Sequence, residues 1–365
     1  MSHSSISSPR VLMMAGGTGG HVFPALAVAK ELQSRGAEII WMGTASGLEA
    51  KLVPQAGYPM ECISITGLRG KGLLSWLTAP LRLAKAIAQA LAIVRRLSPQ
   101  VVVGMGGFAS GPGGLAAWIL RRPLVVHEQN AKAGLTNRVL AWLADLVLEA
   151  FPASFPKRQN ARCVGNPVRE EILALPTPQE RLTDRSGPIH LLVLGGSLGA
   201  LAINQIVPKA LAKLPGNRRP KVRHQAGRTL DAAEAAYAKT DVIADLKEFI
   251  DDMAAAYAWA DLVVCRSGAL TVAELAAAGL PAVLIPFPHA TDDHQSYNGA
   301  YLADRGAAIL IQQRELNAER LAETLSDLCG NRQRLLDMAK SARSAAWPDA
   351  TNDIANACYV AAEAA

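Results

Sequence analysis

The sequence predicts an α/β protein of two similar Rossmann-like domains, each built on a parallel sheet, that face one another across a cleft. Three observations lead to this fold class. The 365 residues exceed the usual length of a single domain. Short apolar runs alternate with helical segments, which is typical of parallel sheets covered on both faces. A strand, a loop of the form Gly-Gly-Thr/Ser-x-Gly and a helix follow one another at Gly16 and again at Gly195.

The first half of the chain supplies the elements of one such domain. Each expected strand is a short apolar run bounded by turn residues. In chain order we expect a strand at 11–15, a glycine loop at 16–20, a helix at 24–35, strands at 38–42 and 101–103, a second glycine loop at 104–114 and a strand at 124–127.

The same scheme restarts after a stretch rich in proline. In chain order we expect a strand at 190–194, a glycine loop at 195–200, a helix at 203–214 and strands at 222–225, 242–244, 262–265 and 282–285. The hinge should lie near residues 165–170. Ligands of open α/β sheets bind at the carboxyl ends of the strands, where all these glycine loops fall.

Composition excludes several classes of protein. Half of the residues are hydrophobic and 19% are charged, unlike a disordered or fibrous chain. The longest apolar stretches fall short of the roughly 20 residues that a membrane span needs. The Ser-rich start has no signal-peptide pattern. The five cysteines are widely spaced without a Cys-x-x-Cys pair, so we expect neither a disulfide framework nor a zinc site.

The net charge of +6 is unevenly distributed. Residues 1–170 carry 18 Lys and Arg against 8 Asp and Glu, whereas residues 171–365 carry 19 against 23. Such a basic half attracts anions, whether nucleic acid, a phosphorylated substrate or an anionic lipid surface. A nucleic-acid-binding surface usually interleaves aromatic residues with basic ones. Here the basic residues alternate mostly with Leu and Ala, so we expect that nucleic acid is not a partner of this protein.

A candidate membrane patch lies within this basic half. It combines apolar side chains that would be poor material for a solvated loop with basic residues on the following helix. Its members are Leu73, Leu74, Trp76, Leu77, Arg82 and Lys85. The alternative is an ordinary amphipathic helix packed on its own domain.

The glycine loops indicate a ligand with a diphosphate, because backbone N–H groups at a helix start can close on phosphate. A nicotinamide dinucleotide is disfavoured. Neither loop is a complete Gly-x-Gly-x-x-Gly, and the strand at 38–42 ends without a carboxylate to hold a ribose. No Gly-x-x-x-x-Gly-Lys-Ser/Thr motif occurs either. The absence of Asp-x-Asp argues against a metal-dependent sugar-nucleotide site, although Asp292 and Asp293 are adjacent.

The segment 265–274 combines a helix start and a carboxylate that could both contact a nucleotide. It runs from a strand into a helix whose first N–H groups, at 268–271, suit a phosphate. Glu274 lies early in this helix, where its carboxylate could accept hydrogen bonds from two ribose hydroxyls. From the pattern alone, a Glu that merely complements the helix dipole is the more ordinary interpretation.

Six motifs in register resemble the MurG family of peptidoglycan N-acetylglucosaminyltransferases. They are the runs 16–27 (GGTGGHVFPALA), 127–130 (HEQN), 165–169 (GNPVR), 195–200 (GGSLGA), 266–274 (RSGALTVAE) and 294–295 (HQ). The resemblance spans nearly the whole chain. It implies the GT-B fold, with domains 1–167 and 168–347 and a last helix at about 348–365 that returns to the first domain.

The resemblance also implies ligands and location. UDP-N-acetylglucosamine would be held mainly by the C-terminal domain, and undecaprenyl-diphospho-N-acetylmuramoyl-pentapeptide by the N-terminal, membrane-facing one. No cofactor and no metal are expected. The protein would lie peripherally on the anionic cytoplasmic face of the bacterial cell membrane, where other cell-wall synthesis proteins are candidate partners.

Carried over residue by residue, the resemblance implies a donor site. Glu274 would be the ribose carboxylate, and Ile250 would meet the uracil through its backbone. The implied contacts with UDP-N-acetylglucosamine are Thr18, Gly19, Gly20, Asn130, Arg169, Ser197, Ile250, Ala269, Leu270, Thr271, Val272, Ala273, Glu274 and Gln295.

His21 is our candidate for the general base of an inverting transfer. It directly follows the first glycine loop, and an imidazole is suited to accept a proton near neutral pH. The alternative is that it caps the helix or orients a phosphate. Glu128 and His127 are reserve candidates. A UDP-N-acetylglucosamine epimerase of the same fold and a non-catalytic nucleotide-sugar-binding protein at the membrane are the two rival functions.

Overall fold

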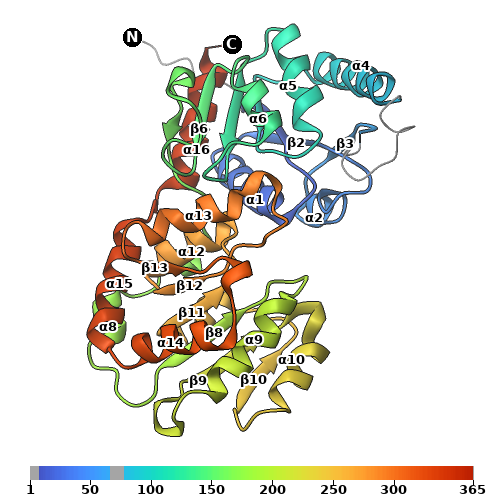
Figure 1. Ribbon diagram of the computed structural model, residues 1–365. Helices are drawn as coiled ribbons and strands as arrows, with labels where there is room; N and C mark the ends of the chain where they lie inside the picture. The colour runs from blue at the N-terminus through green and yellow to red at the C-terminus, as the bar shows by residue number, and fades with distance from the viewer. Residues whose placement is uncertain (1–7, 66–77, 365) are drawn as a thin grey trace. The chain divides into compact units, whose positions relative to one another are not determined.

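The computed structural model describes residues 8–65 and 78–364 and is drawn in Figure 1. The chain divides into two compact units. The first comprises Met1–Pro167 and Pro348–Ala365, and the second comprises Val168–Trp347. Each unit is built on its own parallel sheet, which confirms the expected class of two Rossmann-like α/β domains.

The first unit contains a seven-stranded parallel sheet in the order β3-β2-β1-β4-β5-β6-β7. Its connections are crossovers through helices, as parallel strands require. The strands are β1 (Arg10–Met14), β2 (Glu38–Gly43), β3 (Met60–Cys62), β4 (Val101–Gly104), β5 (Leu124–Glu128), β6 (Leu146–Glu149) and β7 (Arg162–Cys163).

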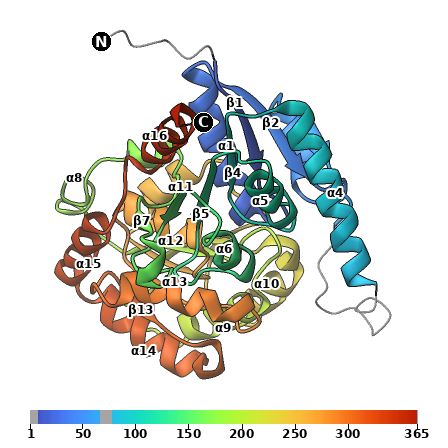
Figure 2. The same cartoon turned by 90° about the horizontal axis from the view of Figure 1, so that it is seen from above.

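Helices cover both faces of this sheet (Figures 1 and 2). They are α1 (Gly19–Ser34), α2 (Glu49–Gln55), α4 (Ala79–Leu97), α5 (Ser110–Ile119), α6 (Leu135–Leu140) and α16 (Ala350–Glu363), with a 3₁₀ turn η1 (Lys157–Gln159). Alternation along β1 separates two cores. Val11 and Met13 pack with α1 and α16, whereas Leu12 and Met14 pack with α4 and α5.

The last helix, α16, belongs to the first unit. It packs on α1, where the Tyr359 hydroxyl donates to the carbonyl oxygen of Arg35 at 3.0 Å. The Arg35 guanidinium in turn donates to the Asn352 and Asn356 side chains. Buried Ile354 and Cys358 join the core on that face of the sheet. The chain end is therefore an integral part of this core.

The second unit contains a six-stranded parallel sheet in the order β10-β9-β8-β11-β12-β13. Its strands are β8 (His190–Leu194), β9 (Lys221–Gln225), β10 (Ala244–Lys247), β11 (Leu262–Cys265), β12 (Ala282–Leu284) and β13 (Ala308–Leu310). The strand expected at 242–244 overlaps β10 only at Ala244, where β10 begins.

The helices of the second unit pack around this sheet (Figure 1). They are α7 (Glu170–Leu173), α8 (Pro178–Leu182), α9 (Leu201–Ala212), α10 (Leu230–Tyr237), α11 (Met253–Trp259), α12 (Ala269–Ala278), α13 (His294–Ala303), α14 (Ala318–Cys329) and α15 (Arg332–Ser344). Short 3₁₀ turns are η2 (Gly216–Arg218), η3 (Gly227–Thr229), η4 (Thr291–Asp293) and η5 (Gln313–Glu315).

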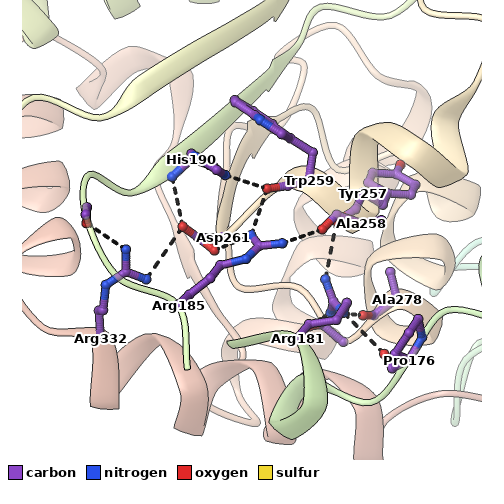
Figure 3. Close-up of polar contacts among 12 residues, drawn as sticks. Pro176, Arg181, Arg185, His190, Tyr257, Ala258, Trp259, Asp261, Ala278 and Arg332 are labelled. Carbon is purple, nitrogen blue, oxygen red and sulfur yellow. Dashed lines mark hydrogen bonds and ion pairs between the residues drawn. The ribbon is translucent and has the colours of Figure 1, made fainter. Parts of the chain in front are cut away.

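Arg181 and Arg185 help to fix the carboxyl ends of α11 and α12 (Figure 3). Arg181 donates to the carbonyl oxygens of Tyr257, Ala278 and Gly279, and Arg185 donates to those of Ala258 and Trp259. Arg185 also pairs with the buried Asp261 carboxylate, which accepts a hydrogen bond from the His190 backbone N–H. Guanidinium groups at helix carboxyl ends satisfy unpaired carbonyls and favour the helix dipole. Both helices also carry side chains of the candidate site.

Candidate functional site

The loop after β1 leads directly into α1. Thr18 is the residue before the helix, and Gly19 and Gly20 form its first turn, so the helix begins within the expected glycine loop. No described side chain caps this end, and the first turn contains no acidic residue. The His21 N–H donates to the Thr18 carbonyl oxygen at 3.1 Å, whereas no described side chain caps the Gly19 and Gly20 N–H groups, which can meet a polar ligand group.

A buried carboxylate fills the inner side of this loop. Glu49, the first residue of α2, accepts hydrogen bonds from the Gly17 N–H at 2.9 Å and from the Thr44 hydroxyl at 2.7 Å. Burial alone would raise the pKa of Glu49, but these hydrogen bonds outweigh it and lower that pKa. The sequence pattern gave this residue no role, because it lies in a helix beyond the strand tip.

His21 lies in the first turn of α1, and Gln129 orients its ring. The distance from His21 Nδ1 to Gln129 Oε1 is 2.9 Å. Gln129 Nε2 lies 3.0 Å from the Met105 carbonyl oxygen and 3.2 Å from His127 Nδ1. The loop after β4 approaches the ring closely, since a Cβ on Gly106 would lie 2.5 Å from His21 Nδ1. Gly106 also has a φ of 91°, which favours glycine.

His127 is fully buried at the end of β5. Its Nε2 lies 2.9 Å from the Gly165 carbonyl oxygen. Burial lowers the pKa of His127 to about 4, and hydrogen bonding to Gly165 only partly offsets this. The ring is therefore neutral near pH 7 and sealed from solvent. This placement removes His127 as a reserve candidate for the base.

Glu128 is also buried, and both of its oxygens are occupied. Oε1 accepts from the N–H and the side-chain amide of Asn130, and Oε2 accepts from the Gly134 N–H and the Asn137 side chain. With 1% of its surface exposed, the carboxylate has little access to a substrate proton. The reserve role of base does not fit this geometry. Glu128 instead shapes the loop 128–137 and orients Asn130.

In the second unit, α12 begins with an open amino end. Gly268 precedes the helix, no described side chain caps it, and its first turn has no acidic residue. Ala269, Leu270 and Thr271 form that turn. Val272 is buried in the core, so any contact it makes with a ligand is through its backbone. The arrangement suits a phosphate.

Glu274 follows in the second turn of α12, where two groups hold it. Arg169 Nη2 lies 3.0 Å from Oε1, and the Tyr257 hydroxyl donates to Oε2 at 3.0 Å. Burial raises the pKa of Tyr257 well above its usual value, with the Glu274 charge adding to the effect, so this hydroxyl remains a donor. A carboxylate fixed in this way still has lone pairs for two ribose hydroxyls. Tyr257 had no signal in the Ala-rich sequence around it.

Ser197, Ile250 and Gln295 follow the carboxyl ends of β8, β10 and β12, at the same sheet edge as the start of α12. Ser197 is exposed in the glycine loop, and Ile250 is partly buried before α11. Gln295 lies in the first turn of α13, where its Oε1 accepts from the Phe287 N–H at 2.9 Å. The second unit thus brings the expected donor residues of its own sequence to one edge.

Helix starts in this unit are capped at some positions and uncapped at others, since α7, α10 and α13 also lack a side-chain cap. Neither α9 nor α12 is capped by a described side chain. By contrast, Thr177, Asp252, Asn317 and Asn331 cap α8, α11, α14 and α15. A cap normally contributes about 1 kcal/mol to helix stability. The starts of α9 and α12 differ from those other uncapped starts in following the expected loop 195–200 and Gly268, at the carboxyl ends of β8 and β11.

The candidate membrane patch is only partly described. Leu73, Leu74, Trp76 and Leu77 lie outside the described residues. Arg82 and Lys85 are exposed on α4, beside Leu81, which is 75% exposed. Helices α4 and α5 lie side by side (Figure 2). Trp118 on α5 is 54% exposed. Across residues 8–65 and 78–364, no helix has both the length and the apolar character needed to cross a membrane.

Comparison with known protein families shows to which family the chain belongs. Residues 11–149 match the N-terminal domain of glycosyltransferase family 28, and residues 190–354 match its C-terminal domain. The chain belongs to glycosyltransferase family 28. The family 28 domains coincide with the two Rossmann-like sheets. The expected glycosyltransferase class is therefore confirmed.

Curated relatives narrow the family 28 assignment. The chain is 56% identical to a Marinobacter nauticus protein over 97% of this chain and 98% of the relative. It is 57% identical to a Nitrosococcus oceani protein over 96% and 98% respectively. Both relatives are named UDP-N-acetylglucosamine–N-acetylmuramyl-(pentapeptide) pyrophosphoryl-undecaprenol N-acetylglucosamine transferase.

Solved structures agree with this family 28 assignment. Acinetobacter baumannii MurG is 42% identical, with a TM-score of 0.86 over 96% of this chain and 99% of that one. The resemblance to the MurG family is confirmed by these matches. A Listeria monocytogenes protein assigned as a UDP-N-acetylglucosamine 2-epimerase is 17% identical, with a TM-score of 0.66 over 98% of each chain. At that identity the likeness concerns the fold alone, so it does not favour the epimerase alternative.

Proposed function

We propose that the protein transfers N-acetylglucosamine from UDP-N-acetylglucosamine to the 4-hydroxyl of undecaprenyl-diphospho-N-acetylmuramoyl-pentapeptide, with inversion at the anomeric carbon. The observation that carries this proposal is the identity of 52–57% over nearly the full chain with transferases named for this reaction. The contacts of both units support it. The reaction belongs to peptidoglycan synthesis.

The second unit holds the donor in this proposal. The start of α12 receives the diphosphate, with Ala269, Leu270 and Thr271 supplying N–H groups and Ala273 lying in the following turn. Glu274 accepts the ribose hydroxyls, supported by its contacts with Arg169 and Tyr257. Ser197, Ile250 and Gln295 contact the phosphate, uracil and sugar respectively.

The first unit supplies the base and the acceptor contacts. His21 takes the proton from the 4-hydroxyl while that oxygen forms a bond to the anomeric carbon. The bond from this carbon to the phosphate oxygen breaks, and UDP leaves with the electron pair. Thr18, Gly19 and Gly20 at the start of α1 lie beside the reacting groups, and Asn130 contacts the sugar. Glu128 keeps Asn130 in position.

Helix dipoles and arginine rather than a divalent cation balance the charge of the leaving UDP in this proposal. The uncapped start of α12 and Arg169 are the described groups suited to this role. We expect full activity in EDTA. Loss of activity that magnesium or manganese restores would overturn the metal-free part and redirect attention to Asp292 and Asp293.

The basic, apolar surface of the first unit binds the membrane peripherally in this proposal, at its cytoplasmic face. Exposed Leu81 and Trp118 beside Arg82 and Lys85 support it. We expect binding to anionic vesicles that salt weakens. Changing Leu73, Leu74, Trp76 and Leu77 to Ser should release the protein from vesicles and leave UDP binding intact. Binding to neutral and anionic vesicles that is equal at every salt concentration would contradict the electrostatic part.

A turnover assay with a lipid-linked acceptor tests the function itself. We expect release of UDP only when the muramoyl-pentapeptide acceptor is present, together with a disaccharide product. Epimerisation of the donor without an acceptor would indicate the epimerase. Binding of the donor without any turnover would indicate a nucleotide-sugar-binding protein.

A further inference from the structure

A continuous chain of hydrogen bonds runs from His21 into the core of the first unit. It connects His21 Nδ1 with Gln129 Oε1 at 2.9 Å, Gln129 Nε2 with His127 Nδ1 at 3.2 Å, and His127 Nε2 with the Gly165 carbonyl oxygen at 2.9 Å. Gln129 Nε2 also meets the Met105 carbonyl oxygen at 3.0 Å. Gln129 and His127 are both buried. The chain therefore exchanges little with solvent.

The two backbone carbonyls set the direction of every hydrogen bond in this chain. A carbonyl oxygen can only accept, so His127 must carry its hydrogen on Nε2, facing Gly165. His127 Nδ1 is then an acceptor. The Gln129 amide must direct its NH₂ group toward Met105 and His127, because both of these atoms accept. Its oxygen is left facing His21.

The orientation of the Gln129 amide also fixes the direction of its hydrogen bond with His21. Gln129 Oε1 can only accept, so His21 Nδ1 must carry a hydrogen in the neutral ring. The lone pair then resides on Nε2. Among residues 8–65 and 78–364, no hydrogen bond to His21 Nε2 is found. His21 is only partly buried, so we take Nε2 as the nitrogen that meets a substrate.

Neighbouring groups support the same arrangement. Burial lowers the pKa of His127 to about 4, so this ring stays neutral and keeps one accepting nitrogen near pH 7. The backbone at Gly106 lies so close to the His21 ring that any side chain there would displace it. The ring is therefore held on one side by a glycine backbone and at Nδ1 by an amide oxygen.

We propose that Gln129 is a positioning residue that holds neutral His21 in the Nδ1–H tautomer, so that Nε2 accepts the proton of the acceptor hydroxyl. The role of His21 as base rests on the proposed function, whereas the tautomer rests on the hydrogen bonds alone. Because the orienting group is an amide, it fixes the ring without placing a negative charge beside it. A histidine without such a partner exchanges between two tautomers, of which only one presents Nε2 as an acceptor.

The tautomer can be read directly from ¹⁵N–¹H spectra of the histidine rings in the full chain. Spectra at about pH 8.5, roughly two units above the ordinary histidine pKa, report the neutral rings. We expect His21 as Nδ1–H and His127 as Nε2–H, with His21→Gln identifying the His21 signals among the seven histidines. A wild-type His21 ring in the Nε2–H form would overturn the inference whatever the activity.

Variants at Gln129 test whether the tautomer of His21 affects catalysis. Gln129→Met keeps the length of the side chain but has no acceptor for Nδ1–H. We expect mixed tautomers at His21 and a fall in kcat of about tenfold or more, with the KM for the donor unchanged. Gln129→Glu restores an oxygen facing His21 but lacks the NH₂ group that donates to Met105 and His127, so the Nδ1–H form should return and kcat should recover only in part. A role in folding alone would not favour Glu over Met at this buried position.

Tyr237→Phe is the matched control, because it removes a hydrogen bond to the buried His224 in the second unit. It should leave the His21 signals and kcat unchanged. Gln129→Met with a wild-type tautomer, or with a changed tautomer and an unchanged kcat, would overturn the positioning role. If His21→Gln instead retains most of kcat while the wild-type tautomer is Nδ1–H, the base assignment fails and the tautomer assignment stands.

Discussion

Each unit has a glycine-containing loop before a helix at the carboxyl end of its sheet, after β1 in the first unit and after β11 in the second. The two loops differ in the position of a nearby carboxylate. After β1, the buried Glu49 carboxylate accepts the Gly17 N–H and so occupies the loop from within. After β11, the loop ends at Gly268 and the amino end of α12 is open. There the carboxylate, Glu274, lies in the second turn and is held by Arg169 and Tyr257.

This difference indicates a division of labour. A carboxylate inside a loop reduces the positive potential that its N–H groups offer to a ligand phosphate. The loop after β1 is therefore better suited to holding His21 beside a neutral hydroxyl. The open start of α12 is better suited to a diphosphate. Variants that affect catalysis and donor binding separately test this division.

The largest expected effect is on catalysis through the first unit. His21→Ala should lower the rate of the chemical step by on the order of 10²–10⁴-fold, the usual contribution of a general base. UDP affinity should change little, because the contacts proposed for the nucleotide itself, Ile250 and Glu274, lie in the second unit. Single-turnover rates with calorimetric UDP binding in parallel provide the measurement. A loss under tenfold, or one explained by weaker binding, would remove His21 from this role.

The next effect concerns acid stability, for which the described residues of each unit include one buried histidine. Burial lowers the pKa of both His127 and His224 from 6.5 to about 4. Above pH 6.5 folded and unfolded chains both hold neutral rings. As the pH falls from 6.5 toward 4, the unfolded chain binds protons that the folded chain cannot. The free energy of unfolding should therefore fall by up to about 3 kcal/mol for each histidine.

Denaturant unfolding between pH 7.5 and 4.5 measures this loss. His224→Phe should flatten the pH dependence of the second unit only, and it should leave that of the first unit unchanged. Separate transitions for the two units would allow each slope to be assigned. A wild-type slope that His224→Phe does not alter would show that other groups, such as the buried carboxylates, dominate acid unfolding.

Much of the fold could be predicted from the sequence, because continuous apolar strands and glycine loops are local signals. The strands at β1, β8 and β11 fall within about a residue of the expected ranges. The loop expected at 104–114 was misjudged. Its second half is α5, in which Gly113 and Gly114 allow close packing against Met14 and Leu140. The glycines in that segment allow close packing of a helix and do not form a loop.

The candidate site was less predictable, since its geometry depends on contacts between distant segments. Glu274 and Arg169 were expected near the nucleotide, but nothing in the sequence indicated that they pair, 105 residues apart. Tyr257, Glu49 and Gln129 act through such long-range hydrogen bonds. Glu128 was expected as a reserve base because it ends a strand, and its burial and its four hydrogen-bond donors, which do not fit that role, appear only in the structure.

A smaller effect is expected on donor binding through the second unit. Glu274→Ala should weaken UDP binding by about 1.5–3 kcal/mol, the range for a hydrogen bond to a charged group. UDP should protect the wild-type protein against thermal unfolding and the variant much less. UDP lacking both ribose hydroxyls should bind the two proteins equally. Unchanged UDP affinity in the variant would remove Glu274 from the donor site.

The smallest effect tests whether Glu274 must be held in place. Tyr257→Phe removes one hydrogen bond to its Oε2 and leaves the Arg169 contact. We expect UDP binding to weaken by about 0.5–1.5 kcal/mol, the net range for one hydrogen bond. Isothermal titration with UDP, and with UDP lacking both ribose hydroxyls, measures it.

Tyr237→Phe gives the comparison for this last prediction, since it also removes a buried hydroxyl from the second unit but one bonded to His224. It should cost similar folding stability and leave UDP affinity unchanged. If Tyr257→Phe weakens both nucleotides equally, the hydroxyl supports the packing of α11 and α12 in general. A loss seen only when the ribose hydroxyls are present would show that Tyr257 acts through the orientation of Glu274. The open start of α12 would then depend on the carboxylate one turn further along the helix for its preference for a ribonucleotide.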